Sequence, residues 1–248
     1  MTLGNVTDCG ASELDKRPLP HKLLAMKCHI YLLLAGSLAV SRTEAQTNLP
    51  DGATDARPSV ETIVLIRHGE KPHAGLGQLT VQGLNRALAL PDVLLPRYGK
   101  PDYVFAPNPT QKADQDRYYY VRPLATIEPT AIRCELPVDT EFGFLDIGEL
   151  EHELEKTQYR GALIYIAWEH VLAEQFAKKL LKDNGGDPRQ VPRWSNDEYD
   201  MIFVFKIAHA AGTNSVTFSV EHEGLNNLSS DYPKISTPDG GTNAPSKP

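Results

Sequence analysis

The feature that most constrains this sequence is an apolar, β-branched run that stops abruptly at charged and small residues. The run is Ile63-Val64-Leu65-Ile66, and Arg67-His68-Gly69 follows it directly. An apolar run of this length bounded by charge is typical of a buried strand in an α/β sheet. Residues after such a strand lie at the carboxyl end of the sheet, where open α/β folds bind ligands. The sequence therefore predicts a polar site that contains Arg67 and His68.

Composition indicates an ordinary globular protein with one sizeable domain or two small ones. Hydrophobic residues make up 41% of the 248 residues and charged residues 23%, which are typical shares. The formal net charge is -7, so no basic excess is present to displace counterions from a nucleic acid or to bind an anionic membrane. We therefore expect no nucleic-acid partner.

The first 45 residues are predicted to be an N-terminal extension followed by a signal peptide. Residues 26–45 hold a lysine, an apolar core from Ile30 to Val40 and a polar stretch with small residues at Thr43 and Ala45. The core is shorter than the roughly 20 apolar residues that span a bilayer, and the order of features is typical of a secretory signal. We expect cleavage near Ala45, a periplasmic or secreted protein, and no stable membrane insertion after signal removal. A first structural helix or a membrane anchor is the alternative.

The rest of the chain alternates strand and helix patterns. A Pro-, Gly- and Asp-rich linker is expected at 46–60, a domain at 61–225 and a disordered tail at 226–248. The alternation, with a hairpin at its end, predicts a three-layer α/β/α sandwich with a mixed, mostly parallel central sheet. Strands are expected at 62–67, 102–106, 136–140, 163–168, 200–208 and 215–221, and helices over 79–90, from Arg122, over 147–156 and up to about Asp183.

Within the presumed mature chain, Cys134 is the single cysteine. It cannot form an internal disulfide, so the domain must be held together by its core. Its apolar, helical surroundings predict a buried and inert thiol.

Two apolar strands of the predicted sheet end in the same way. The first runs into Arg67-His68 and the second into Glu169-His170. If the two strands are parallel neighbours, both imidazoles emerge at one edge. The helix that opens at Arg122 follows another strand, so its guanidinium can reach the same edge. Two arginines and two histidines would form a compact anion site, because the arginine fork matches phosphate oxygens and stays charged.

Such a site can perform phosphoryl transfer. One histidine must keep an unprotonated ring nitrogen aimed at phosphorus, while its other nitrogen donates to a backbone carbonyl. The arginines and the second histidine would stabilise the equatorial oxygens in an in-line transfer. This chemistry requires no metal or other cofactor, and its substrate would be a phosphorylated small molecule.

Four segments resemble motifs of the histidine phosphatase superfamily, in its phosphoglycerate mutase-like branch. VLIRHGEK at 64–71 resembles the motif around the family's phosphate-accepting histidine. LTVQGLNRA at 79–87 resembles the LTxxGxxQA segment, with Arg86 in place of glutamine. RPLATIEP at 122–129 resembles RAxQTAxP, and LIYIAWEH at 163–170 resembles a strand that ends in histidine and glycine. Pro123, Ala125, Glu169 and Val171 depart from these patterns.

The resemblance covers about residues 62–221 and implies an α/β sandwich with a two-step reaction. His68 matches the phosphate acceptor, and Arg67, Arg122 and His170 match the phosphate clamp. A phosphohistidine would form on His68 and water would hydrolyse it. The general acid is open between three carboxyl groups: Glu141, Asp146 and Glu169.

The sequence therefore predicts an exported phosphomonoesterase of the histidine acid phosphatase type. A catalytically inactive domain that binds phosphorylated ligands is one alternative, and a phosphomutase is another if the protein is cytosolic. Tyr118-Tyr119-Tyr120, just before Arg122, either pack under the preceding loop or form a wall for the substrate.

Overall fold

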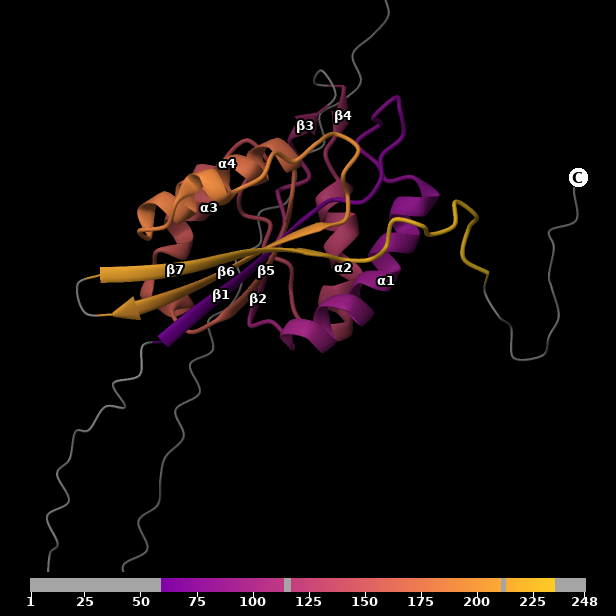
Figure 1. Cartoon of the computed structure of the whole chain (residues 1–248). Coiled ribbons are helices and arrows are strands. Elements are labelled where there is room, and N and C mark those ends of the chain that lie inside the picture. Colours follow the sequence, from indigo (N-terminus) through magenta and orange to yellow (C-terminus); the bar gives the residue numbers. More distant parts are fainter. Residues whose placement is uncertain (1–58, 114–116, 211–212, 235–248) are drawn as a thin grey trace, which may run out of the picture. The chain divides into compact units, whose positions relative to one another are not determined.

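A five-stranded mixed sheet in the order β2-β5-β1-β6-β7 organises the part of the chain that the structure describes (Figure 1). This computed structural model describes residues 59–113, 117–210 and 213–234. The predicted extension, signal peptide and nearly all of the predicted linker lie outside these residues. The strands of the sheet are β1 (Ser59–Arg67), β2 (Tyr103–Phe105), β5 (Leu163–Trp168), β6 (Met201–Ala210) and β7 (Thr213–His222).

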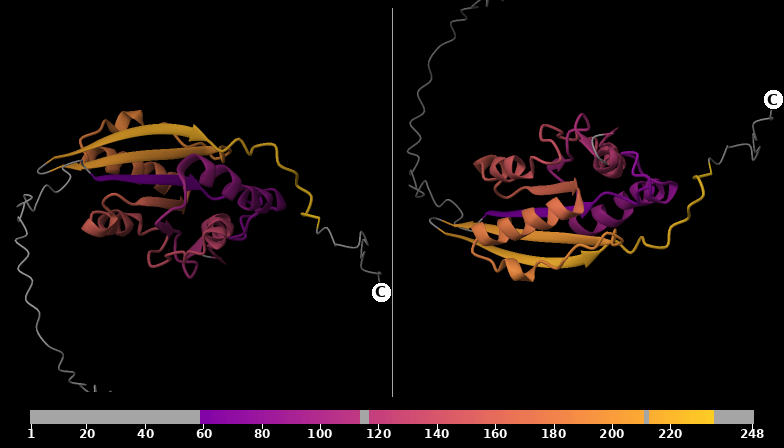
Figure 2. Two further views of the ribbon diagram at one scale, coloured as in Figure 1. Left: turned by 90° about the horizontal axis from the view of Figure 1, so that it is seen from below. Right: turned by 90° about the horizontal axis from the view of Figure 1, so that it is seen from above.

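The centre of the sheet is parallel and one side is antiparallel. β1 pairs in parallel with β5, from Thr62 opposite Leu163 to Arg67 opposite Trp168, and β5 pairs in parallel with β2. β6 runs antiparallel to β1, and β7 antiparallel to β6. Figure 2 shows β6 and β7 as a long hairpin beside β1. The mixed sheet of the prediction is confirmed.

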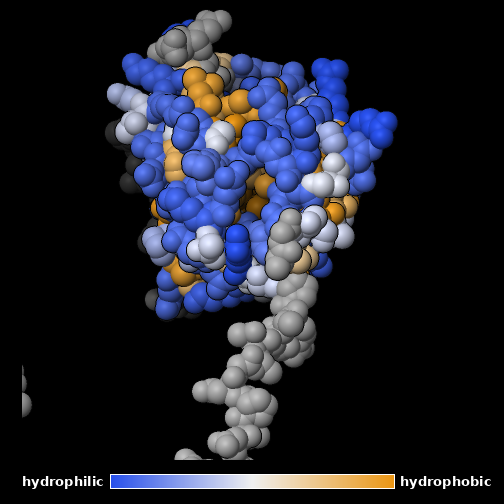
Figure 3. Space-filling view, turned by 90° about the vertical axis from the view of Figure 1, so that its left-hand side faces the viewer, coloured by the Kyte–Doolittle hydropathy of each residue, from blue (hydrophilic) through white to orange (hydrophobic). Residues whose placement is uncertain are grey.

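Helices cover both faces of the sheet because the residues of β1 alternate between two apolar cores. Ile63 and Leu65 pack with the helices α3 (Ile147–Leu154) and α4 (His170–Asp183). Val64 and Ile66 pack with α1 (Val81–Tyr98) and α2 (Arg122–Cys134). This gives the predicted three layers. The face drawn in Figure 3 is largely hydrophilic, with apolar side chains gathered in small areas.

The prediction that the first helix ends near Leu90 is wrong, because α1 continues through Pro91 and Pro96 to Tyr98. A proline inside a helix costs about 3 kcal/mol through its missing N–H and its clash with the preceding turn. Leu90 and Leu94 are both fully buried in the core. Burial of two leucines on this stretch offsets the cost of the prolines, at about 1.5–3 kcal/mol for each side chain.

The predicted strand at 136–140 is also wrong. In this segment Asp139 makes an isolated bridge to Phe105, with Asp139 N–H donating to Val104 O at 2.8 Å. Pro137 lies in the middle of the segment and has no N–H to donate to a ladder. Residues 107–121, for which no strand is predicted, contain a small antiparallel pair of β3 (Lys112–Ala113) and β4 (Tyr118–Tyr119).

Part of the predicted disordered tail lies along α1. Residues 226–234 are described, whereas 235–248 are not. Asn85 donates from its amide to the backbone oxygens of Ser229 and Asp231 at 2.7 and 2.9 Å, and Gln82 donates to Asn226 O at 3.3 Å. Side-chain amides on the helix thus satisfy carbonyls that regular structure leaves open.

Cys134 is buried and unpaired at the end of α2, as predicted. No helix within the described ranges combines the length and the hydropathy needed to cross a membrane.

Candidate active site

The ends of three elements bring the predicted site residues to one edge of the sheet. Arg67 is the last residue of β1 and His68 follows it. Because Arg67 stands opposite Trp168 in the parallel register, His170 at the start of α4 emerges at the same edge. Arg122 is the first residue of α2. The backbone N–H of His68 donates to Trp168 O at 3.1 Å, which joins the two strand ends.

All four predicted residues meet in a buried cluster. Their exposed fractions lie between 0% and 6%. The other three act electrostatically on the His68 imidazole, and they are Arg67, Arg122 and His170. The structure therefore places the four side chains close enough to interact electrostatically, and their catalytic roles stay a prediction.

The His68 ring is held in the form that a nucleophile needs. Burial, together with the positive charge of Arg67 and Arg122, lowers the pKa of His68 well below its ordinary value, although its bond to Gly69 opposes the shift. Nδ1 lies 2.7 Å from Gly69 O. A carbonyl oxygen only accepts, so Nδ1 carries the proton and Nε2 keeps its lone pair.

Two glycines let the backbone around His68 pack tightly. A Cβ at Gly69 would lie 2.9 Å from the carbonyl oxygen of Gly83 in α1, and one at Gly83 would lie 2.5 Å from Glu70 O. Only residues without a Cβ allow this approach. Gly69 N–H also donates to the Thr126 hydroxyl of α2 at 2.9 Å. The His68 turn is thus fixed against both helices of its face.

Arg67 combines complete burial with unused hydrogen-bond donors. Its Nη1 donates to Ser195 O at 3.0 Å and to Glu198 O at 2.5 Å, and its Cζ lies 3.9 Å from the centre of the Tyr199 ring. Burial lowers the pKa of Arg67. Nε and Nη2 are buried and have no hydrogen-bond partner among the described residues. Buried N–H groups without acceptors are costly, and an oxyanion would satisfy both.

Arg122 and two tyrosines complete the surroundings of His68. Nη1 of Arg122 donates to Gly75 O at 3.3 Å, and its Cζ lies 4.6 Å from the centre of the Tyr120 ring. Tyr120 and Tyr199 lie beside the His68 imidazole, edge-on and tilted, at centroid distances of 6.0 and 6.1 Å. Each arginine therefore rests on a tyrosine, and each tyrosine flanks the histidine.

The three consecutive tyrosines have different environments. Tyr120 is buried against Phe144, with ring centroids 4.8 Å apart. Tyr118 and Tyr119 form β4, and Tyr119 is 59% exposed. Tyr120 is therefore a packing residue, which is one of the two predicted roles. Tyr119 is exposed at the surface.

Both ring nitrogens of His170 lie close to side-chain oxygens, and within the described residues Nε2 forms a hydrogen bond whereas Nδ1 does not. Nε2 lies 2.8 Å from Asn196 Oδ1, and Nδ1 lies 2.5 Å from Glu169 Oε1. The other Glu169 oxygen accepts from the backbone N–H groups of Val171 and Leu172 and so caps α4. Burial alone would raise the pKa of Glu169, but its bonds to His170 and to these N–H groups lower it. Glu169 is therefore an ionised helix cap. An ionised carboxylate has no proton to donate, so Glu169 is not the general acid.

The other two candidate acids are exposed side chains near Phe144. Asp146 accepts from Gln111 Nε2 at 2.9 Å and precedes α3. Glu141 is exposed, and its backbone N–H donates to Asp139 Oδ1 at 2.9 Å. The geometry of the site does not choose between these two carboxyl groups.

Sequence reasoning missed the segment Trp194–Tyr199, which supplies contacts to Arg67 and His170. Two of these contacts come from backbone carbonyls, which any residue can provide. The position of this segment, just before a strand, was the one signal that could have identified it. β6 begins at Met201 and runs antiparallel to β1, so residues just before β6 lie at the edge where β1 ends.

A cavity of about 80 Å³ lies elsewhere, near the amino end of β1. Two buried carboxylates of its lining are paired: Glu61 with His209 at 2.8 Å and Glu151 with Lys179 at 3.0 Å. This cavity therefore lacks the unused buried donors of Arg67. Within the described segments, no group of three or more His, Cys, Asp or Glu side chains could hold a metal ion.

No protein-family model and no curated protein matches the sequence. Several solved structures do match. A candidate phosphohistidine phosphatase SixA from Nakamurella multipartitia is 16% identical at a TM-score of 0.48, and the match covers 67% of this chain and 98% of that one. A phosphoserine phosphatase from Entamoeba histolytica is 13% identical at a TM-score of 0.39, over 66% and 98%. A mycobacterial glucosyl-3-phosphoglycerate phosphatase is 14% identical at 0.39, over 65% and 98%. These identities are too low to transfer an activity, so the function must be argued from the site residues.

Proposed function

We propose that this chain is a phosphatase of the histidine phosphatase superfamily that hydrolyses phosphomonoesters through a phosphohistidine on His68. The observation that carries the proposal is the pairing of His68 with Arg67. His68 is neutral with a free Nε2 lone pair. Within the described residues, two buried nitrogens of the neighbouring Arg67, Nε and Nη2, have no acceptor. A phosphoryl group satisfies both, because it offers an electrophilic phosphorus and anionic oxygens.

The first step transfers the phosphoryl group to the enzyme. Nε2 of His68 attacks phosphorus, an N–P bond forms, and the bond from phosphorus to the ester oxygen breaks. Arg67 and Arg122 hold the equatorial oxygens with His170 beside them. The leaving oxygen takes a proton from a carboxyl group or from water. Glu141 and Asp146 are the carboxyl candidates, because Glu169 is held ionised by its bonds.

The second step restores the enzyme. Water attacks phosphorus, the N–P bond breaks, and the electron pair returns to Nε2 of His68. The proton released by water leaves with the inorganic phosphate or passes to a base. The side chains of the chain itself supply the positive charge that both steps require.

We also propose export, which rests on the pattern at 26–45 alone. Hydrolysis suits a periplasmic or secreted enzyme, since a phosphomutase needs the phosphorylated metabolites of the cytosol. The N-terminal sequence of protein recovered outside the cytoplasm tests this point. A mature chain that begins near Gln46 is expected, and an uncleaved N-terminus would contradict it.

Hydrolysis of p-nitrophenyl phosphate by wild type, His68→Ala and His152→Ala tests the activity. His152 is an exposed histidine on α3 and serves as the control. We expect turnover and an acid-labile phosphoenzyme in wild type and in the control, and neither in His68→Ala. Vanadate binding without turnover in wild type would indicate the inactive phospholigand-binding domain. Transfer to an added alcohol in preference to water would indicate a mutase.

A further inference from the structure

The segment Trp194–Tyr199 is anchored firmly below the site. Trp194 is buried and its ring lies 4.4 Å from that of Phe203, centroid to centroid. Its backbone N–H donates to Glu174 Oε2 at 2.9 Å, and its indole Nε1 donates to Glu198 O at 3.0 Å. The ends of this short segment are therefore fixed, although Asn196 itself is exposed.

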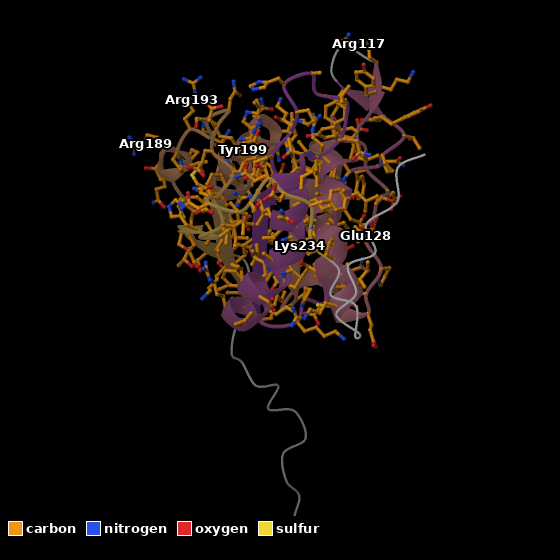
Figure 4. All side chains as sticks on the ribbon, turned by 90° about the vertical axis from the view of Figure 1, so that its right-hand side faces the viewer. Arg117, Glu128, Arg189, Arg193, Tyr199 and Lys234 are labelled. Carbon is orange, nitrogen blue, oxygen red and sulfur yellow. The ribbon has the colours of Figure 1, made fainter. Side chains whose placement is uncertain are left out.

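The anchored segment holds the Arg67 guanidinium from one side. Ser195 and Glu198 accept from Nη1 through their backbone oxygens, and the Tyr199 ring lies against Cζ. Figure 4 labels Tyr199 together with Arg193 from the same stretch of chain. Both of these hydrogen bonds are donated by Nη1. Nε and Nη2 therefore have no hydrogen-bond partner among the described residues.

The same segment reaches His170 through a single side chain. Asn196 Oδ1 lies 2.8 Å from Nε2 of His170, on the opposite side of the ring from Glu169. Nδ1 lies close to Glu169 but has no hydrogen-bond partner among the described residues, so it stays open to a phosphoryl oxygen while Asn196 holds Nε2. Glu169 belongs to the helix cap of α4, next to His170 in sequence, so Asn196 provides the one long-range restraint on the ring that these contacts show.

We infer that Asn196 is a positioning residue, which orients His170 toward the phosphoryl group on His68. The inference rests on the proposed phosphatase function. A misplacement of a catalytic group by about 1 Å can cost on the order of 10²-fold in rate. Loss of the Asn196 oxygen should therefore lower kcat, with little effect on stability because the side chain is exposed.

Three variants test this role: Asn196→Leu, Asn196→Asp and Asp197→Leu. Leucine is similar in size to asparagine but offers no acceptor, whereas aspartate keeps one. Asp197 is an exposed neighbour and serves as the matched control. We measure kcat and KM for p-nitrophenyl phosphate, and the thermal unfolding midpoint of each variant.

We expect kcat of Asn196→Leu to fall by about 10- to 100-fold, with KM and the unfolding midpoint close to those of wild type. Asn196→Asp should recover kcat to within a few fold and raise KM, because its added negative charge repels the substrate. The Asp197→Leu variant should retain kcat. The inference is overturned if Asn196→Leu keeps the wild-type kcat, or if leucine and aspartate lower kcat equally. A wild type that turns over no ester, like His68→Ala, would instead refute the phosphatase function.

Discussion

Two fully buried arginines lie near the same end of the sheet, and their surroundings are opposite. Arg67 donates hydrogen bonds to two neutral carbonyl oxygens and lies against an aromatic ring, and burial lowers its pKa. Arg86 is surrounded by carboxylates. Although burial opposes it, bonds and charge from Glu70 and Glu223 raise the pKa of Arg86. A site cation must keep its donors for a ligand, whereas a structural cation is stabilised by saturating them.

The Arg86 cluster joins segments that are far apart in the chain. Glu70 accepts from both Nε and Nη2 of Arg86, with a shortest distance of 2.7 Å. Asp200 lies 3.4 Å from Nη1, and Glu223 accepts from the same nitrogen. Asn226 Oδ1 accepts from Nη2 at 3.1 Å. The cluster thereby ties the turn after His68 to α1, to the start of β6 and to the segment after β7.

Replacement of Arg86 by methionine should produce the largest change in stability. The variant leaves three carboxyl groups in the core without their cation, and breaking a buried ion pair typically costs about 3–5 kcal/mol. Urea unfolding measures the loss in the free energy of unfolding. The control is Arg133→Met, because Arg133 and its partner Asp92 are both more than half exposed and such a pair contributes at most about 1 kcal/mol. Equal losses for the two variants would contradict the contrast.

Replacement of Arg67 by methionine should separate activity from stability. Removal of one preorganised donor group lowers the rate by about 10²–10³-fold. The free energy of unfolding should stay the same or increase, since the variant removes a buried cation with unsatisfied N–H groups. Turnover of p-nitrophenyl phosphate and urea unfolding are measured on the same preparation. A destabilisation as large as that of Arg86→Met would show that Arg67 is a structural cation as well.

The sequence was informative about Arg67, His68, Arg122 and His170 because each stands at the end of an element with a readable pattern. The parallel pairing of two apolar strands can be predicted from their sequence patterns alone. This pairing places the ends of both strands at one edge of the sheet. Asn196 lacked such a signal, since it stands in an irregular segment with no periodicity. The core positions of β1 were equally predictable, because alternation along a strand assigns its residues to the two faces.

The Arg86 cluster shows why the rest could not be predicted. Arg86 was visible only as a departure from a motif, and its partners Asp200 and Glu223 come from more than 100 positions away. Local patterns do not pair such residues. The continuation of α1 through Pro91 also depends on tertiary packing. Burial of Leu90 and Leu94 overrides the low helix propensity of proline.

The smallest expected effect is on the pH dependence of stability, and it comes from Glu223 in the Arg86 cluster. Burial, reinforced by Asp200 and Glu70 against the opposing Arg86, raises the pKa of Glu223 from 4.5 to about 8. Between these values the folded protein binds a proton that the unfolded chain has released. The stability from this group is therefore fully present below about pH 4.5 and is lost as the pH rises toward about 8. A single group changes the free energy of unfolding by at most about 1.4 kcal/mol per pH unit.

Glu223→Gln should remove this slope, because glutamine resembles the protonated carboxyl group and does not titrate. Urea unfolding of wild type and variant at several pH values from about 5 to about 8 measures the difference. The control is Glu128→Gln, an exposed position on α2 that Figure 4 labels, and its curve should stay parallel to that of wild type. Parallel curves for Glu223→Gln as well would mean that Glu223 is ionised throughout. Arg86 would then sit among three full negative charges, and the excess charge of the cluster would have to be stabilised by groups other than a bound proton.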